Sequence, residues 1–404
     1  MSYFINLSLL RRNRNFRCLY LGQFVSFIGT MITSVAVPYQ IYSLTHSTLM
    51  VGLISLFQLL PLLFTALAGG VLADRQHRKL LLIFAEILLA CGCLALAGNA
   101  AIHQPNIVII FVIAIFMSAI NGLHRPALDS ITQQIVNKED FPMVGSLSTF
   151  TYSVCMIVGP AIGGLIISHL GLVITFIVDF ASFGISLIAL SLIKNVPKPT
   201  ARQEQSIITS LVEGCRYAVS RQELLGTYFI DFIAMVFGMP MALFPAIAHS
   251  HGGAKILGLL YSAPAVGALF ISVVSGWTKH IKRYGIAISV AAVLWGISII
   301  LFGLSANLML ALFFLALAGA ADAVSGIFRQ TLWNETIPNE YRGRLSGIEM
   351  ISYMGGPKLG DTEAGLVAAA FGVTASIISG GVLCVMGVIT CCYFLPKFWQ
   401  YKAE

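Results

Sequence analysis

Seven acidic side chains lie within long apolar stretches of this sequence, where an ionised carboxylate is costly and is usually retained for function. They are Glu86, Asp179, Asp231, Asp322, Glu349, Asp361 and Glu363. Asp361 follows Lys358 by three residues, so on a helix the two side chains share a face and can form an ion pair. Protonation of Asp361 would release Lys358, which is the chemistry needed to couple proton movement to a conformational change.

Four of these residues also have a structural interpretation. The Asp361–Lys358 pair could be a static contact, and Glu363, near the expected external end of its span, could be solvated. Glu86 lies about two turns from a loop, so its carboxylate could extend to the membrane surface. Asp179, in the middle of its span, could face a cavity or pair inside the N-terminal half.

A second group of charges lies towards the expected cytoplasmic ends of the spans. Asp322 and Arg329 are seven residues apart, which places them two turns apart on one stripe of a helix. Arg329 is expected to act as a gating residue, and Asp231 is expected to be a gate partner rather than a substrate contact.

The composition of the chain identifies the environment that must position these groups. Of 404 residues, 57% are hydrophobic and only 10% are charged, whereas a soluble domain carries about 25% charged residues. A bilayer core needs about 20 apolar residues for each helix. Continuous apolar runs favour helices over a barrel, whose strands alternate. The sequence therefore predicts an all-α membrane protein.

Twelve apolar runs predict twelve transmembrane helices in two pseudo-symmetric six-helix halves. The expected halves are residues 1–193 and 224–404, joined by a cytoplasmic linker at 194–223 that includes an amphipathic helix. The runs lie near 19–44, 51–73, 80–100, 106–127, 144–168, 172–193, 224–248, 256–278, 285–305, 308–333, 345–371 and 375–396.

The two halves contain related motifs. "GPAIGG" at 159–164 recurs as "GPKLGD" at 356–361, and Arg125 and Arg329 occupy equivalent places ahead of them. Repeated halves in a membrane protein place a substrate site near the bilayer midplane, where the halves meet.

The distribution of Lys and Arg predicts the orientation. With both termini in the cytoplasm, only Lys255 and Lys358 of the 24 basic residues lie outside cytoplasmic segments and helix ends. This distribution explains the net charge of +7 without a nucleic-acid partner. The eight cysteines form no CxxC pair, so neither a disulfide framework nor a metal site is expected.

The run "GGVLADRQHRK" at 69–79 resembles the loop signature between spans two and three of the major facilitator superfamily, with His77 in place of the usual glycine. The resemblance covers the whole chain and implies a gate that closes the cytoplasmic side. Plain positive charge at a cytoplasmic loop is the alternative for the basic residues. The expected gating residues are Gly70, Asp74, Arg75, Arg78, Lys79, Arg125 and Arg329.

The "GPAIGG" run resembles the span-five antiporter motif of the same superfamily, which occurs mainly in proton-coupled exporters. Its residues here are Gly159, Pro160, Gly163 and Gly164. Ser146 and Cys155 stand where the full motif has two further glycines. Small residues and a proline let the helix lie tightly against a neighbour, and ordinary helix packing is the alternative role.

Several runs are similar to the enterobactin exporter family and related drug/proton antiporters. They include "NLSLLRRNRNFR" at 6–17, "GGVLADR" at 69–75 and "GPKLGDTEAG" at 356–365. The resemblance implies a monomer in the bacterial inner membrane that exports a siderophore or another amphiphilic small molecule. An importer of a siderophore or nutrient and a general multidrug efflux pump remain alternatives.

No G-x-x-x-x-G-K-[ST] run or clustered catalytic set occurs, so an enzyme is not expected, and a proton gradient replaces a cofactor as the energy source. Lys358 is the one basic residue expected deep in the membrane. That favours a neutral, cationic or weakly anionic cargo, or Lys358 as its single anchor. The expected cavity residues, each of which could also be structural, are Gln23, Tyr39, Gln40, Gln58, Asn121, Tyr152, Tyr353 and Lys358.

Overall fold

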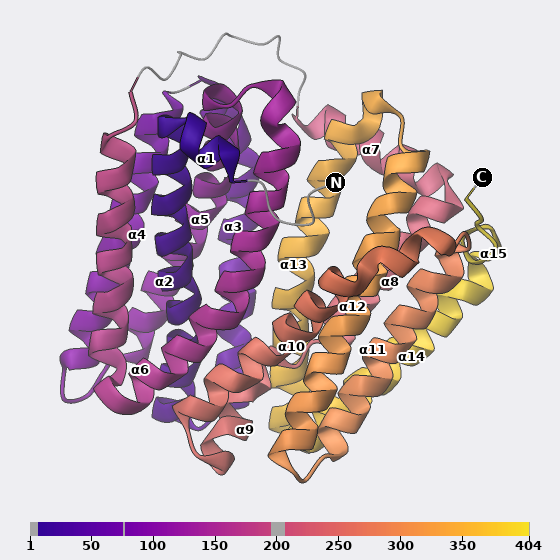
Figure 1. The fold of residues 1–404 in the computed structure, drawn as a ribbon. Helices are drawn as coiled ribbons and strands as arrows, with labels where there is room; N and C mark the ends of the chain where they lie inside the picture. The colour runs from indigo at the N-terminus through magenta and orange to yellow at the C-terminus, as the bar shows by residue number, and fades with distance from the viewer. Residues whose placement is uncertain (1–6, 76, 195–206, 404) are drawn as a thin grey trace. The chain divides into compact units, whose positions relative to one another are not determined.

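The computed structural model describes residues 7–75, 77–194 and 207–403, which in these ranges form α-helices and short 3-10 helices without strands (Figure 1). Side chains are left undescribed at 67–75, 207–211, 339–340, 342–344, 346–348 and 350–351. The elements before residue 195 are α1 (Ser8–Arg12), α2 (Arg14–Thr45), α3 (Thr48–Arg75), α4 (Arg78–Ala101), α5 (Ile107–Ile135), η1 (Lys138–Asp140) and α6 (Phe141–Ser191).

The described elements from residue 207 onward include short 3-10 and α-helical segments beside the long helices. They are α7 (Ile207–Ser220), α8 (Gln222–Phe237), η2 (Met241–Leu243), α9 (Phe244–His251), α10 (Ala254–Val274), η3 (Ser275–His280), α11 (Tyr284–Leu304), α12 (Leu308–Thr336), α13 (Asn339–Phe371), α14 (Val373–Phe394) and α15 (Pro396–Trp399).

Ten helical stretches among the described residues are long and apolar enough to cross a membrane, which confirms the all-α membrane fold class. The count of twelve stays a prediction. One of the ten, Lys138–Ser191, covers both of the runs expected as spans five and six. It contains Gly171 with φ of 81°, a conformation that glycine adopts without a steric penalty, so α6 bends there. The α13 helix is not among the ten.

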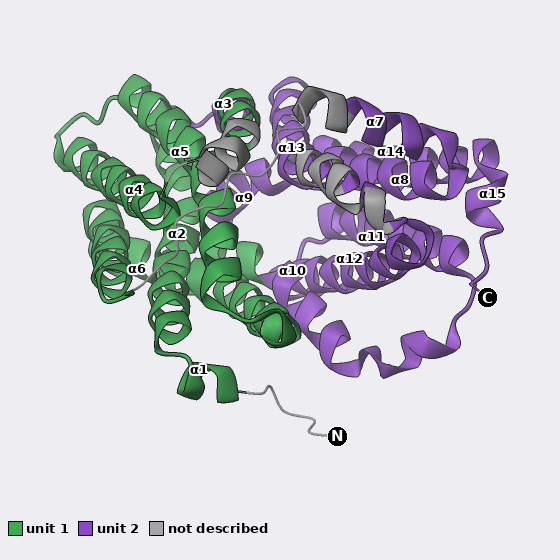
Figure 2. Cartoon of the chain, turned by 90° about the horizontal axis from the view of Figure 1, so that it is seen from above, with its two compact units in different colours: residues 1–45, 57–203, 252–262 green, residues 46–56, 204–251, 263–404 purple. Residues whose placement is uncertain are grey.

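The chain forms two compact units, shown in different colours in Figure 2. Unit 1 contains residues 1–45, 57–203 and 252–262, and unit 2 contains residues 46–56, 204–251 and 263–404. The α3 helix thus contributes its first turns to unit 2 and the rest to unit 1. The α10 helix contributes its first turns to unit 1 and the rest to unit 2.

Each unit has its own buried apolar core. In unit 1, Leu82, Ala127 and Ile131 are fully buried, and in unit 2 the same holds for Ile230 and Ile288. The first core joins α4 to α5, and the second joins α8 to α11, so each core holds helices of its unit together.

The run expected as span seven is interrupted, which differs from the continuous helix predicted for 224–248. The α8 helix ends at Phe237, and η2 begins three residues after Gly238. Pro240 has no N–H to continue the helix. The Trp295 Nε1–H donates to the Gly238 carbonyl at 2.8 Å, which satisfies one of the groups freed by the break. In contrast, α13 continues as a helix through Gly356 and Pro357.

Candidate functional site

Asp361 on α13 is held by groups from two other elements of unit 2. Its carboxylate accepts a hydrogen bond from Ser55 Oγ of α3 at 2.9 Å and another from the Ala242 N–H of η2 at 2.9 Å. The Ala242 N–H is free to donate because it lies in the first turn of η2, where no helical acceptor exists. Lys358 interacts electrostatically with the same carboxylate.

The α3 and α13 helices approach closely at this point. A Cβ on Gly52 would lie 2.8 Å from the Asp361 carbonyl oxygen, and one on Gly365 would lie 2.9 Å from the Gly52 Cα. Thr362 Oγ1 donates to the Gly52 carbonyl at 3.2 Å, and Thr48 Oγ1 donates to the Gly365 carbonyl at 3.3 Å. We call this contact the acidic crossing; it lies wholly in unit 2.

A second close approach joins α6 to the first turns of α10 in unit 1. A Cβ on Gly164 would lie 2.5 Å from the Ala254 carbonyl oxygen, and one on Gly258 would lie 2.5 Å from the Pro160 carbonyl oxygen. Ser262 Oγ donates to the Ile157 carbonyl at 2.7 Å. We call this contact the glycine crossing.

The other glycines of the span-five motif pack against α2. A Cβ on Gly163 would lie 3.2 Å from the Ile32 Cα, and Gly159 contacts Met31. All four motif residues, including Pro160, are buried. The motif therefore provides two tight helix contacts inside unit 1.

The two crossings occupy equivalent places in the repeated sequence. Aligning "GPAIGG" at 159–164 with "GPKLGD" at 356–361 pairs Gly164 with Asp361. Each of these residues meets a glycine in the first turns of another helix, which is Gly258 in one case and Gly52 in the other. The acidic crossing therefore has an ionisable side chain, Asp361, at the position where the glycine crossing has Gly164.

Replacing Gly164 by Ala is expected to destabilise the glycine crossing, because the added methyl meets backbone atoms that cannot move aside cheaply. The expected cost is about 1–3 kcal/mol, which is typical of overpacking. Thermal unfolding of purified protein in detergent measures it. Gly184→Ala on the same helix is the matched control, since a Cβ there has no neighbour within 4 Å. Equal unfolding temperatures for the two variants would contradict the steric role.

A second cluster in unit 2 gathers three of the predicted acids around Arg329. The Arg329 guanidinium forms an ion pair with Asp231 and lies 3.7 Å from the Asp322 carboxylate. Glu349 interacts electrostatically with both Arg329 and Asp231. Ser352 Oγ donates to Asp231 at 3.4 Å.

The charges in this cluster do not balance. With Asp231, Asp322 and Glu349 ionised, one arginine leaves a formal charge of −2. The Arg329 and Asp231 side chains are only 13% and 14% exposed, whereas Asp322 is 40% exposed. The excess negative charge therefore has an accessible side, where a proton or a cationic group could be bound.

Asp179 is almost completely buried in unit 1, and both of its carboxylate oxygens have donors. Thr33 Oγ1 donates to Oδ2 at 2.5 Å, Cys93 donates to the same oxygen at 3.2 Å, and Ser182 donates to Oδ1 at 3.1 Å. This arrangement favours pairing inside unit 1, which was one of its two interpretations.

The interpretation of Glu86 as a side chain that extends to the membrane surface is wrong, because its carboxylate is fully buried. Gln23 Nε2 donates to Glu86 Oε1 at 2.5 Å, and Ser186 Oγ donates to the same oxygen at 2.9 Å. His124 Nε2 lies 3.6 Å away. His124 was not among the residues predicted from the sequence, although a histidine inside an apolar run is itself a signal of a buried polar site.

The predicted gating residues are only partly described. Gly70, Asp74 and Arg75 fall among the side chains outside the described residues. Arg78 donates to the Ser130 carbonyl at 3.4 Å, and Lys79 donates to the Ile193 carbonyl at 2.7 Å.

Arg125 is exposed and interacts electrostatically with Asp129. Among the predicted coupling acids, Glu363 is partly buried. The same holds for three predicted cavity residues, which are Tyr39, Asn121 and Lys358.

The remaining predicted cavity residues differ in their contacts and in their burial. Gln23 is bound to Glu86, and Gln58 Nε2 donates to the Ala114 carbonyl at 3.4 Å. Tyr152 stacks on Phe27 with ring centroids 6.1 Å apart. Both amide atoms of Gln40 are buried, and neither has a hydrogen-bond partner within the described part of the chain. Tyr353 is 57% exposed.

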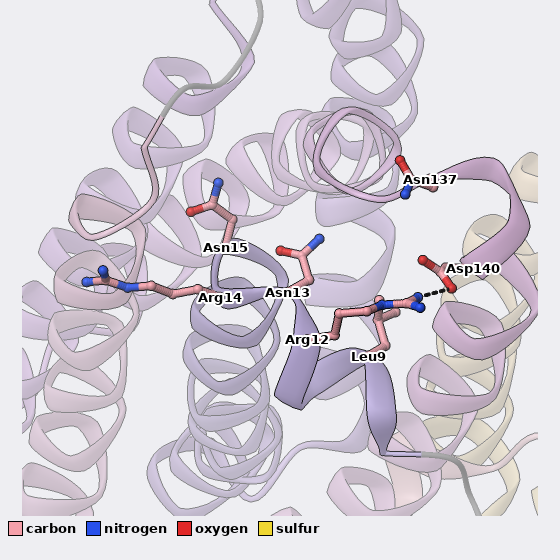
Figure 3. A pocket seen from close by; sticks show the side chains of 7 residues that line it. All are labelled: Leu9, Arg12, Asn13, Arg14, Asn15, Asn137 and Asp140. Atoms are coloured by element: carbon pink, nitrogen blue, oxygen red, sulfur yellow. Dashed lines mark hydrogen bonds and ion pairs between the residues drawn. The ribbon is translucent and has the colours of Figure 1, made fainter.

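A pocket of about 380 Å³ lies in unit 1, away from all of these residues. Figure 3 shows Arg12 directed at Asp140, to which it donates at 2.6 Å, while Arg14 points away. Asn13 Nδ2 donates to the Ile135 carbonyl at 2.7 Å. The pocket thus reflects how the N-terminal segment attaches to α5 and η1, and it contains none of the predicted site residues.

Known proteins resemble the chain over nearly its whole length. The family described as transmembrane secretion effector matches residues 7–403. The enterobactin exporter EntS of Citrobacter koseri is 28% identical over 390 residues, covering 96% of this chain and 94% of that protein.

Two solved structures share the fold. A POT family transporter in complex with 5-aminolevulinic acid matches with a TM-score of 0.77 at 12% identity, covering 96% of this chain and 97% of that one. The nucleoside transporter NupG matches with a TM-score of 0.67 at 16% identity, covering 96% and 100%.

The chain belongs to the transmembrane secretion effector family of the major facilitator superfamily. It is a multi-pass membrane transporter of a small-molecule substrate and not an enzyme.

Proposed function

We propose that this transporter is a proton-coupled exporter of a siderophore-like amphiphilic molecule, acting as a monomer in the bacterial inner membrane with both termini in the cytoplasm. The export direction and the cargo class are supported by the relatives named as enterobactin exporters. The coupling is supported by one observation, which is the acid built into one of two otherwise equivalent helix crossings.

Protonation of Asp361 would change the acidic crossing in a defined way. The ionised carboxylate accepts hydrogen bonds from Ser55 Oγ and the Ala242 N–H. A proton on the oxygen that Ser55 contacts turns that oxygen into a donor, so the hydrogen bond with Ser55 must reverse its direction, and the lost negative charge weakens the hydrogen bond from the Ala242 N–H. The attachment of the first turns of α3 to α13 is weakened as a result. The glycine crossing contains no ionisable group at the equivalent position, so the proton acts on only one crossing.

The Arg329 cluster supports a second candidate cargo. Three acids around one arginine favour a cationic amphiphile, which is the cargo class of a general multidrug efflux pump. An aromatic pair is linked to this cluster. Tyr228 interacts electrostatically with Glu349, and the Tyr228 ring stacks on that of Trp333 with ring centroids 5.4 Å apart. Aromatic rings and carboxylates are the groups that bind organic cations.

Uptake into proteoliposomes separates the two cargo classes. Vesicles with an acidic lumen are offered either enterobactin or a cationic dye, with protein-free vesicles as the control. The proposal expects protein-dependent accumulation of enterobactin to exceed that of the dye. Accumulation of the dye alone would favour multidrug efflux, and accumulation of neither would contradict both cargo classes.

A further inference from the structure

A buried acid and a histidine in unit 1 face each other with unused polar atoms. Glu86 on α4 and His124 on α5 lie 3.6 Å apart, measured from Glu86 Oε1 to His124 Nε2. Glu86 is fully buried, and the His124 side chain is 15% exposed. Neither Glu86 Oε2 nor His124 Nε2 has a hydrogen-bond partner among the described residues.

The two oxygens of the Glu86 carboxyl group differ in their hydrogen bonds. Gln23 and Ser186 both donate to Oε1, which holds the carboxyl group between α2 and α6. The other oxygen is left without a donor, and burying an ionised carboxylate oxygen without a donor is costly. A proton on Oε2 removes that cost, and His124 Nε2 is the nearby base that can take the proton back.

Asp179 provides the comparison within the same unit. It is as buried as Glu86, but donors reach both of its oxygens from three side chains. Both oxygens of Asp179 therefore have donors, whereas only one oxygen of Glu86 has them among the described residues. The difference between the two acids lies in the distribution of donors and not in their burial.

Three of the helices around the pair carry further charged groups. On α5, the exposed Asp129 interacts electrostatically with Arg125 and with His124. On α4, Lys79 lies two turns before Glu86 and donates to the Ile193 carbonyl. On α6, Asp179 lies two turns before Ser186, and α2 contributes the neutral Gln23, which donates to Glu86 and Ser186.

The pair can exchange one proton internally. His124 is slightly exposed and Glu86 is buried. Transfer of a proton from the imidazolium to the Glu86 carboxylate leaves the imidazole neutral and the carboxyl protonated. The reverse transfer leaves an imidazolium and a carboxylate, so charge and protons balance in both directions.

We propose that Glu86 and His124 together hold one exchangeable proton inside unit 1, and that this pair is a second protonation site of the transporter besides Asp361. Its use in transport rests on the proposed proton coupling, whereas the binding of the proton does not. Hydrogen bonds join α2, α4 and α6 in this network, and His124 brings α5 within 3.6 Å of Glu86, so a change of its protonation alters contacts among four helices.

Infrared difference spectroscopy of the purified full-length protein during a pH titration tests the proposal without any cargo. A protonated carboxyl band is expected in the wild type that is lost as the pH rises. Glu86→Gln is expected to remove this band, and Glu139→Gln, at an exposed acid of η1, is expected to retain it. His124→Gln is expected to retain the band but to displace its midpoint pH, since the carboxyl has lost its proton partner.

Three results would overturn the proposal. They are a band unaffected by Glu86→Gln, a Glu86 band that does not titrate, and a midpoint that is unchanged in His124→Gln. The last of these remains informative even if Glu86→Gln does not fold. Failure of the proposed transport function is seen separately, as wild-type vesicles that do not respond to a pH gradient while the infrared band still titrates.

Discussion

Replacement of Asp361 by Asn is expected to reduce gradient-driven uptake in proteoliposomes to the level seen without a gradient. The amide has nearly the shape of the protonated carboxyl group: its oxygen can accept from the Ala242 N–H, and its NH2 group can donate to Ser55 Oγ, so both contacts of the acidic crossing can be retained. It cannot gain or lose a proton. The loss therefore affects coupling, and cargo binding measured at equilibrium is expected to stay within a few-fold of the wild type.

Two further variants make this prediction specific. Glu139→Gln removes an exposed acid outside the spans and is expected to transport normally. Ser55→Ala removes one donor to Asp361 but keeps the acid, so transport is expected to persist with an altered pH dependence. Unchanged gradient-driven uptake in Asp361→Asn would make Asp361 structural and would move the search for the coupling acid to Asp179 and Asp231.

Replacement of Arg329 by Gln is expected to destabilise the protein more than any other single change discussed above. It leaves Asp231 buried without its cationic partner, and breaking a buried ion pair in this way costs about 3–5 kcal/mol. A lowered thermal unfolding temperature in detergent measures the effect. The same substitution removes the only guanidinium that balances Asp322 and Glu349 within the described part of the cluster.

A double substitution distinguishes this explanation from a simple loss of packing. Combining Arg329→Gln with Asp231→Asn removes both charges, so most of the lost stability is expected to return. If the two losses simply add, the ion pair between Arg329 and Asp231 does not explain the destabilisation.

The sequence predicted the membrane fold because composition and apolar runs are local signals. It also predicted that Asp322 and Arg329 share a helix stripe, and the structure places their charges 3.7 Å apart. The ion pair between Arg329 and Asp231 was out of reach, because those residues are 98 positions apart on different helices. Periodicity along one helix contains no information about which helix packs beside it.

The surroundings of Asp361 show the same limit. Its neighbour Lys358 was visible from spacing alone, whereas Ser55 is 306 positions away and the Ala242 N–H depends on an interruption of span seven. Glu86 was misjudged because its distance from a loop was taken as a measure of exposure. Its burial depends on Gln23, Ser186 and His124, which come from three other helices.

The central claim is that inward proton movement drives cargo out of the cell by exchange. The most direct test is the sign of the pH gradient that drives enterobactin accumulation in proteoliposomes of the wild-type protein. An antiporter accumulates cargo in vesicles with an acidic lumen, because protons leave as cargo enters, and this result is the one predicted. Accumulation in vesicles with an alkaline lumen would show proton symport, and would contradict the exporter in favour of an importer.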